Sequence, residues 1–223
     1  MSPPAAEPSG RTGRPPRTSR AQIMAAAGRL IDRDGWQKLT MRRLAAEAGT
    51  SPTTLYHHIR DKEDLLTRLL DDHADSTPRP DLPRDPRERI AAAATAIHDS
   101  LATWPWIVEI LTADDLTGDS ALWMVETIVA GAVDCGCTPE QAVHVYRGIW
   151  YYTVGEIVVR TNAARRRAES ERPAHRDTRF RSLDPAELPH LAALGERWPE
   201  LTARDTYASG LRALIDGLLP HHP

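Results

Sequence analysis

The sequence has little of several features that mark whole classes of protein. It contains only two cysteines in 223 residues, Cys135 and Cys137, which is too few for a disulfide framework, and a structural zinc site would need further ligands beside them. No apolar run approaches the roughly 18 residues of a membrane-spanning helix. The N-terminal stretch MSPPAAEPSGRTGRPPRTSR has no apolar segment that could serve as a secretory signal. We therefore expect no membrane partner, no metal, no cofactor and a cytoplasmic location.

Motifs of the common catalytic sites are missing as well. The sequence contains no GxSxG, no HExxH and no glycine-rich phosphate loop. An adjacent acidic pair, Asp114 and Asp115, is more typical of a loop or a helix cap than of a general acid and base. The sequence therefore predicts no catalytic residues, and a helical enzyme stays only as an alternative to the functions considered below.

Charge is distributed unevenly along the chain. The net charge is −3, but residues 11–70 hold 12 Lys and Arg against 6 Asp and Glu, while the rest of the chain holds 16 against 25. A basic first third joined to an acidic body indicates a polyanionic partner for the first third. A chance asymmetry of a solvated surface is the alternative explanation.

Strand patterns are nearly absent and helix patterns recur throughout, so the expected fold class is all-α. Residues 1–17 are rich in Pro, Gly, Ser and Arg without apolar periodicity, which predicts a disordered arm. Residues 18–65 contain three short helices and the start of a fourth, and the proline-rich stretch TPRPDLPRDP then interrupts the helical pattern. We expect residues 66–223 to form a second helical domain, in which the Arg- and Glu-rich residues 161–182 make a loose loop.

The short helices have capping residues at the spacing of a helix-turn-helix. Thr40 and Ser51 are placed as N-caps, and Pro52 stands at the first helical position, where a missing N–H costs nothing. Gly49 allows the left-handed backbone that a tight turn needs. With Leu55 packed inward, helical geometry turns the neighbouring polar side chains outward, where they can reach phosphates and base edges. These outward residues are Thr53, Thr54, Tyr56 and His57.

This stretch resembles the DNA-binding signature of the TetR family of transcriptional regulators. The similarity lies in LTMRRLAAEAGTSPTTLYHHIRDKEDLL and covers about residues 18–70. The segments around HVYRGIWYYTVGE and YASGLRALIDGLL are similar, more weakly, to the dimer-forming helices of TetR-type C-terminal domains. The resemblance implies an N-terminal three-helix DNA-binding domain and a helical C-terminal domain for effector binding and dimerisation.

The resemblance also implies which residues contact DNA. Arg42 matches an arginine that can reach guanine, because its guanidinium suits O6 and N7 of that base. Lys62 matches a lysine that clamps a phosphate, whereas Pro52 can offer a base only apolar contact. An exposed surface position without a contact is the simpler alternative for each residue. The predicted DNA contacts are Thr40, Arg42, Pro52, Thr53, Thr54, Tyr56, His57, His58 and Lys62.

A single DNA-binding domain, which we call the reading head (residues 18–65), makes few base contacts. A homodimer on double-stranded, palindromic operator DNA is therefore expected, with its two reading heads about 34–36 Å apart. Small residues favour close helix approach and occur in the two segments that resemble dimer-forming helices. The predicted dimer helices therefore lie near residues 139–165 and 202–219, where Gly148, Gly155, Ala208, Gly210 and Gly217 are found.

Aromatic side chains concentrate in the second domain, where they either form its core or line a pocket for an apolar, aromatic small molecule. We expect a repressor that such an effector releases from its operator, by favouring a conformation whose two heads are wrongly spaced. A DNA-binding protein controlled by a protein partner is the alternative. The candidate ligand contacts are His98, Trp106, Glu109, Trp123, Arg147, Tyr151 and Glu156.

Overall fold

The structure is a computed structural model, in which residues 19–113, 118–169 and 175–220 are described. These residues form helices and connecting turns without a strand, as expected for an all-α fold. The chain divides into two compact units, Met1–Leu66 and Thr67–Pro223. No helix in the described ranges is long and apolar enough to cross a bilayer. The arm expected at residues 1–17 lies outside the described residues.

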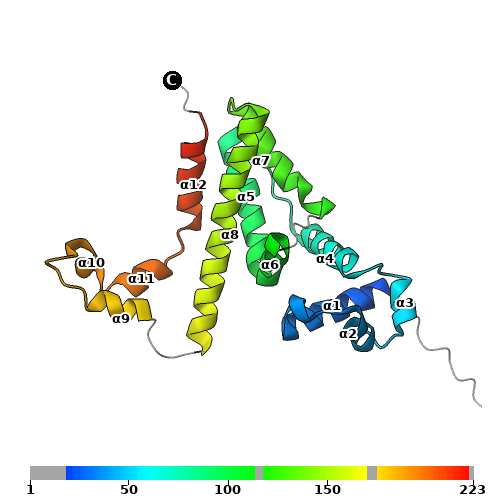
Figure 1. Cartoon of the computed structure of the whole chain (residues 1–223). Coiled ribbons are helices and arrows are strands. Elements are labelled where there is room, and N and C mark those ends of the chain that lie inside the picture. Colours follow the sequence, from blue (N-terminus) through cyan, green and yellow to red (C-terminus); the bar gives the residue numbers. More distant parts are fainter. Residues whose placement is uncertain (1–18, 114–117, 170–174, 221–223) are drawn as a thin grey trace, which may run out of the picture. The chain divides into compact units, whose positions relative to one another are not determined.

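The first unit contains three helices, a 3-10 turn and the start of α4 (Figure 1). These elements are α1 (Arg20–Asp34), η1 (Trp36–Lys38), α2 (Met41–Glu47), α3 (Pro52–Tyr56) and α4 (Lys62–Ser76). The caps predicted at Thr40 and Ser51 are present, and α1 has one as well. Ser19 forms a capping box with Gln22, Thr40 accepts from the Arg43 backbone N–H, and Ser51 accepts from that of Thr54.

The core of the first unit consists of aliphatic side chains from all four helices. Leu44 of α2, Leu55 of α3 and Ile59 after it are completely buried, as their spacing predicts. Ile23 of α1 and Leu65 of α4 are buried as fully. Burial of one such side chain contributes about 1.5–3 kcal/mol, so the two-turn helix α2 and the five-residue α3 depend on this packing for stability.

The second unit is a bundle in which α5 packs on α7, α7 packs on α8, and α12 packs on both α8 and α5. Three short helices, α9 to α11, pack on one another beside this bundle (Figure 1). The elements after α4 are α5 (Pro86–Thr103), α6 (Pro105–Ala113), η2 (Asp119–Ala121), α7 (Leu122–Asp134), α8 (Pro139–Glu169), α9 (His175–Arg181), α10 (Pro189–Leu194), α11 (Trp198–Ala203) and α12 (Tyr207–Leu218).

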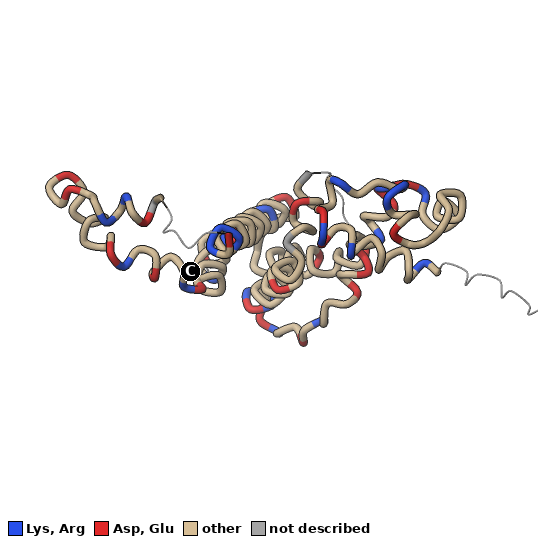
Figure 2. Tube along the Cα trace, turned by 90° about the horizontal axis from the view of Figure 1, so that it is seen from below, with Lys and Arg blue, Asp and Glu red and all other residues tan. Residues whose placement is uncertain are grey.

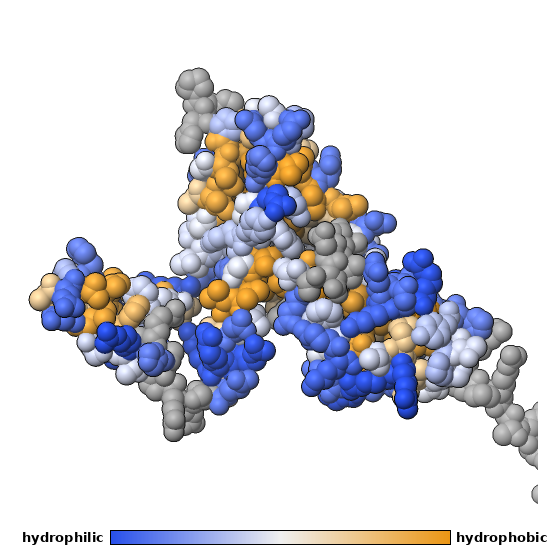
Figure 3. All heavy atoms as spheres, in the orientation of Figure 1, coloured by the Kyte–Doolittle hydropathy of each residue, from blue (hydrophilic) through white to orange (hydrophobic). Residues whose placement is uncertain are grey.

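The loose loop expected over residues 161–182 is wrong for most of that range. Helix α8 continues without a break to Glu169, and α9 occupies His175–Arg181. The arginines suit the helix because Arg166 and Arg167 lie in its last turn, where cations are favoured by the helix dipole. The C-terminal end of α8 is accordingly basic (Figure 2) and hydrophilic at its surface (Figure 3).

Two of the predicted small residues bring α8 and α12 of the same chain together. A Cβ atom at Gly148 would lie 2.9 Å from Leu218, and Gly210 leaves no room for a Cβ against Tyr152. By contrast, a Cβ at Gly155 or Gly217 would meet nothing within 4 Å. Gly148 and Gly210 therefore allow close helix packing within one chain, while Gly155 and Gly217 face open space.

Candidate nucleic-acid interface and effector cavity

The turn between α2 and α3 has the conformation of a helix-turn-helix. Gly49 adopts a φ of 64°, and the Thr50 N–H donates to the Ala45 carbonyl at 2.9 Å to close the end of α2. Ser51 then begins α3, with its hydroxyl 2.9 Å from the Thr54 hydroxyl and 3.1 Å from the Thr54 N–H. These contacts fix the angle at which α3 leaves α2.

Ion pairs between α1 and α2 hold the reading head together. Glu47 accepts from Arg29 at 3.2 Å and from Arg33 at 3.1 Å, and Arg43 pairs with Asp34. Hydrogen bonds from Arg33 and Arg29 lower the pKa of Glu47 below its usual value. Arg43 also donates to the Lys38 carbonyl at 2.9 Å. These charged side chains are paired with one another, so their role is to stabilise the reading head.

The neighbouring Arg42 is different, because its side chain is exposed and makes no ion pair with the described residues. Thr53 and Tyr56 of α3 are exposed, as is His57 directly after it, and Tyr56 keeps 53% of its surface accessible. The structure thus leaves a guanidinium, two hydroxyls and an imidazole facing outward around the turn. Such groups can donate to phosphates and to base edges.

The other predicted DNA contacts are more constrained. Thr54 and His58 are half-buried, and the Thr40 hydroxyl accepts from the Arg43 N–H at 3.3 Å while remaining exposed. Pro52 is exposed at the first position of α3. The ammonium of Lys62 lies 5.0 Å from the centre of the Trp36 ring, a cation–π contact that fixes the lysine at the start of α4.

An apolar cavity of about 170 Å³ lies inside the second unit, between α4, α5, α6, α7 and α8. Leu70, Ile97, Leu101, Met124 and Trp150 form much of its wall. The polar groups on the wall are the His73 imidazole, the Ser100 hydroxyl and the Tyr146 phenol. None of the described residues that line it carries a carboxylate, an ammonium or a guanidinium, so the cavity suits an uncharged ligand.

A second hollow of about 750 Å³ opens on the surface of the same unit, along α5 between the end of α4 and α12. Its wall includes Pro80, Ala92, Thr95, Trp104 and Leu211. Glu88, Asp99 and Arg212 place charges there as well. We call the first hollow the inner cavity and the second the outer groove.

The predicted ligand residues line neither the inner cavity nor the outer groove. Arg147 and Tyr151 contact each other on the exposed face of α8, with the guanidinium 5.1 Å from the ring centre. Trp106 is half-buried edge-on to Trp104, while Glu109 is exposed. Trp123 is half-buried, with the Arg79 guanidinium 5.3 Å from its ring centre.

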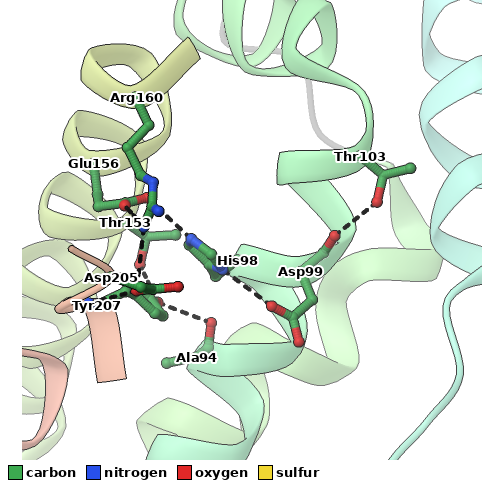
Figure 4. Close-up of polar contacts among 9 residues, drawn as sticks. All are labelled: Ala94, His98, Asp99, Thr103, Thr153, Glu156, Arg160, Asp205 and Tyr207. Atoms are coloured by element: carbon green, nitrogen blue, oxygen red, sulfur yellow. Dashed lines mark hydrogen bonds and ion pairs between the residues drawn. The ribbon is translucent and has the colours of Figure 1, made fainter. Parts of the chain in front are cut away.

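His98 and Glu156, the remaining two, belong to a polar cluster that joins α5, α8 and α12 (Figure 4). The His98 ring lies 3.0 Å from Glu156 at one nitrogen and 3.0 Å from Asp99 at the other. It stacks on Tyr207 at 3.8 Å between ring centres. The Tyr207 hydroxyl contacts Thr153 at 2.8 Å and donates to the Ala94 carbonyl at 3.2 Å. This cluster fixes the start of α12 and has its hydrogen bonds satisfied within the protein.

Sequence reasoning missed the wall of the inner cavity. His73 and Leu70 belong to α4, and Tyr146 and Trp150 each precede a predicted ligand contact, Arg147 and Tyr151, by one residue. Helical periodicity carried a usable signal, since Tyr146 and Trp150 are four residues apart and share one face of α8. Which face turns inward is decided by the packing of α7 and α5.

Comparison with known proteins places both units in one family. The family model "Bacterial regulatory proteins, tetR family" matches residues 23–69, and "Tetracyclin repressor-like, C-terminal domain" matches residues 79–221. The HTH-type transcriptional repressor DrrR1 of Streptomyces coeruleorubidus is 28% identical over 209 residues, which cover 88% of this chain and 76% of that protein.

Solved structures share the fold. ActR from Streptomyces coelicolor in complex with actinorhodin aligns with a TM-score of 0.70 at 21% identity, over 90% of this chain and 94% of ActR. Mycobacterium smegmatis BioQ aligns with a TM-score of 0.64 at 25% identity, over 90% of this chain and 97% of BioQ. A structure of BioQ with its double-stranded DNA operator aligns with a TM-score of 0.58 at 22% identity, over 91% of this chain and 99% of BioQ.

The helix-turn-helix geometry and the family models agree. The second model alone spans more than half of the chain, and members of this family are in general DNA-binding regulators rather than enzymes. The chain belongs to the TetR family of bacterial regulatory proteins and is a DNA-binding transcriptional regulator.

Proposed function

We propose that the protein is a repressor that binds a palindromic operator as a homodimer and leaves it when a small, uncharged molecule occupies the second unit. The single observation that carries this proposal is the course of α4. This helix begins at Lys62 in the reading head, and its later residues Leu70, His73 and Ala74 line the inner cavity. A ligand in the cavity therefore touches the helix on which the reading head is mounted.

The proposed DNA contacts are seven of the nine predicted residues. Arg42, Thr53 and His57 are the exposed groups for reading base edges. We assign Thr40, Tyr56 and Lys62 to phosphate contacts, because Thr40 caps α2, Tyr56 ends α3 and Lys62 begins α4. Pro52 offers apolar contact, and the half-buried Thr54 and His58 support the position of α3.

The proposed homodimer is supported by an apolar face of α8 that the same chain leaves exposed. Tyr151, Val158 and Val159 keep 57%, 40% and 65% of their surface exposed, and Gly155 between them has open space around it. The spacing of these residues puts them on one side of the helix. On α12, Leu218 is 37% exposed next to Gly217. Apolar surface over α8 is visible in Figure 3. A second copy that packs α8 and α12 against this face would cover it.

Release by a ligand needs only a difference in affinity between two conformations. If the ligand fits better when α4 is tilted, and DNA fits better when it is not, each weakens the binding of the other by the same factor. Relatives support this reading: DrrR1 is named a repressor, and ActR was solved in complex with actinorhodin.

The proposal is tested by selecting binding sites from random duplex DNA with the purified protein, followed by a salt titration on the best site. A palindrome with a steep decline of affinity in salt is the expected result. Sedimentation of the complex should give two chains per site. Weak binding without sequence enrichment would sink the proposal.

A further inference from the structure

The inner cavity by itself is small for a regulatory ligand. A dry apolar cavity of about 150 Å³ accepts benzene, whereas sites for drug-sized molecules measure about 300–1,000 Å³. At about 170 Å³, the inner cavity holds one aromatic ring with little to spare. The outer groove, at about 750 Å³, is large enough but lies open on the surface.

Two residues, His73 of α4 and Ser100 of α5, line both hollows. The His73 Nε2 lies 3.0 Å from the Ser100 carbonyl oxygen and 2.9 Å from the Ser100 hydroxyl, so its N–H donates toward α5. Thr77 extends this contact, with its hydroxyl 2.9 Å from that of Ser100. The imidazole and the hydroxyl are thus a thin partition between the inner cavity and the outer groove.

The partition is made of side chains that can move without unfolding a helix. Rotation of the His73 ring about its own side-chain bonds would break its hydrogen bonds to Ser100. The Trp104 ring is tilted against the His73 ring, with 5.7 Å between the ring centres. Burial lowers the pKa of His73, which favours the neutral ring that can leave this place without uncovering a charge. Aromatic rings stand on both sides, Trp150 in the inner cavity and Trp104 in the outer groove.

We propose that His73 and Ser100 form a gate, and that the effector is a flat, uncharged, multi-ring molecule that lies through it, with one ring in the inner cavity and the remainder in the outer groove. The inference rests on the proposed function, because it assigns the site through which a ligand would act. When the His73 ring swings away, the Ser100 carbonyl and hydroxyl lose a partner. A hydroxyl group on the ligand can take its place, which makes a bound oxygen substituent part of the expected chemistry.

The test uses full-length protein and two probes, phenol for a single ring and 1,8-dihydroxyanthraquinone for three fused rings. Dissociation constants are measured by equilibrium dialysis. We expect phenol to compete with the anthraquinone, because both use the inner cavity. Ala92→Trp should block the outer groove, and Ala74→Leu the inner cavity, so each should weaken anthraquinone binding at least tenfold. Ala102→Trp on the exposed side of α5, outside both hollows, is the matched control and should change nothing.

The gate itself is tested by His73→Ala and Ser100→Ala. These variants remain informative if Ala92→Trp or Ala74→Leu, which fill the hollows, fails to fold. His73→Ala should bind the anthraquinone several-fold more tightly, since no ring has to be displaced. Phenol, which stays within the inner cavity, should gain less than the anthraquinone does. Ser100→Ala should weaken the dihydroxy compound three- to tenfold but not 9,10-anthraquinone, which lacks the hydroxyl groups.

Several results would overturn the gate. Binding that ignores Ala74→Leu would assign the anthraquinone to the groove alone, and binding that ignores Ala92→Trp would assign it to the cavity alone. Absence of binding by both probes contradicts the site altogether. A change of sedimentation mass in Ala92→Trp would assign the groove to a second copy of the chain. Operator release is measured separately: binding through the gate without release would sink the proposed function and leave the site intact.

Discussion

Gly210 of α12 packs directly against the phenol hydroxyl of Tyr152 on α8, and no space for a Cβ atom is left between them. The same hydroxyl donates to the Tyr207 carbonyl at 3.3 Å, and the Tyr152 ring stacks on the Tyr207 ring. The contact therefore joins the two helices proposed to form the dimer to the polar cluster at the start of α12.

Gly210→Ala should lower the free energy of unfolding by about 1–3 kcal/mol, because the added methyl group must push Tyr152 off its hydrogen bond. Urea denaturation followed by circular dichroism measures this. Gly28→Ala in α1 is the control, since its Cβ meets nothing within 4 Å, and it should be neutral or stabilising by up to about 1 kcal/mol. Equal stabilities for the two variants would show that α12 does not approach α8 at Gly210.

Arg42 and Arg43 should behave differently although they are neighbours on α2. Arg42→Ala should weaken specific operator binding by about 1–3 kcal/mol while leaving the melting temperature unchanged, because the side chain is exposed. Arg43→Ala should lower the melting temperature, because it removes the pairing with Asp34 and the bond to the Lys38 carbonyl. Fluorescence anisotropy with labelled DNA and thermal melts separate the two effects. The reverse pattern would contradict the assignment of Arg42 to DNA.

Stability of the reading head should fall in mild acid. The folded pKa of Glu47 is lowered by its hydrogen bonds to Arg33 and Arg29, so its contribution is present above the ordinary value of 4.5 and is lost as pH falls through the folded pKa. Thermal melts of the wild type should therefore decline below about pH 4.5. In Glu47→Gln this part of the decline should be absent. If the melting curves of Glu47→Gln superimpose on those of the wild type at every pH, the ion pairs do not contribute to stability.

Tyr207 should make the second unit sensitive to alkali. Burial raises its pKa to about 12, so the folded state holds a neutral phenol where the unfolded chain ionises near 10. The stability that this provides is complete below pH 10 and is lost as pH rises toward 12.

The Tyr207 hydroxyl should also contribute through its bonds to Thr153 and the Ala94 carbonyl. Tyr207→Phe should cost about 0.5–2 kcal/mol at neutral pH, and it should flatten the alkaline decline. A double-mutant cycle with Thr153→Val isolates the side-chain pair. A coupling energy near zero would show that the hydroxyls do not interact.

Charge on the uncovered face of α8 should separate the subunits. Val159→Asp, at a position that is 65% exposed, should shift the sedimentation mass from two chains to one without loss of helix content. Val133→Asp is the control and should remain dimeric, because Val133 is 41% exposed at the end of α7, which precedes the start of α8, whereas Val159 lies twenty residues into α8. A dimeric Val159→Asp protein would move the proposed interface elsewhere.

The sequence by itself determined the reading head. Thr40, Gly49, Ser51 and Pro52 act through local backbone geometry, which is set by a few neighbouring residues, and the structure has each of them in the predicted role. The all-α class and the capping box of Thr138 and Gln141 follow from the same short-range rules.

Tertiary structure alone decided which side chains of the second unit face a cavity. His98 and Glu156, two candidate ligand contacts in the sequence, bind one another and line neither hollow. His73 lines the inner cavity, where its ring is hydrogen-bonded to Ser100 of α5. The charged composition of residues 161–169 suggests a loop, but α8 continues to Glu169. Arg166 and Arg167 lie in its last turn, where the helix dipole favours cations. A polar residue on a helix can serve a core, a surface or a ligand, and only the neighbouring helices select among them.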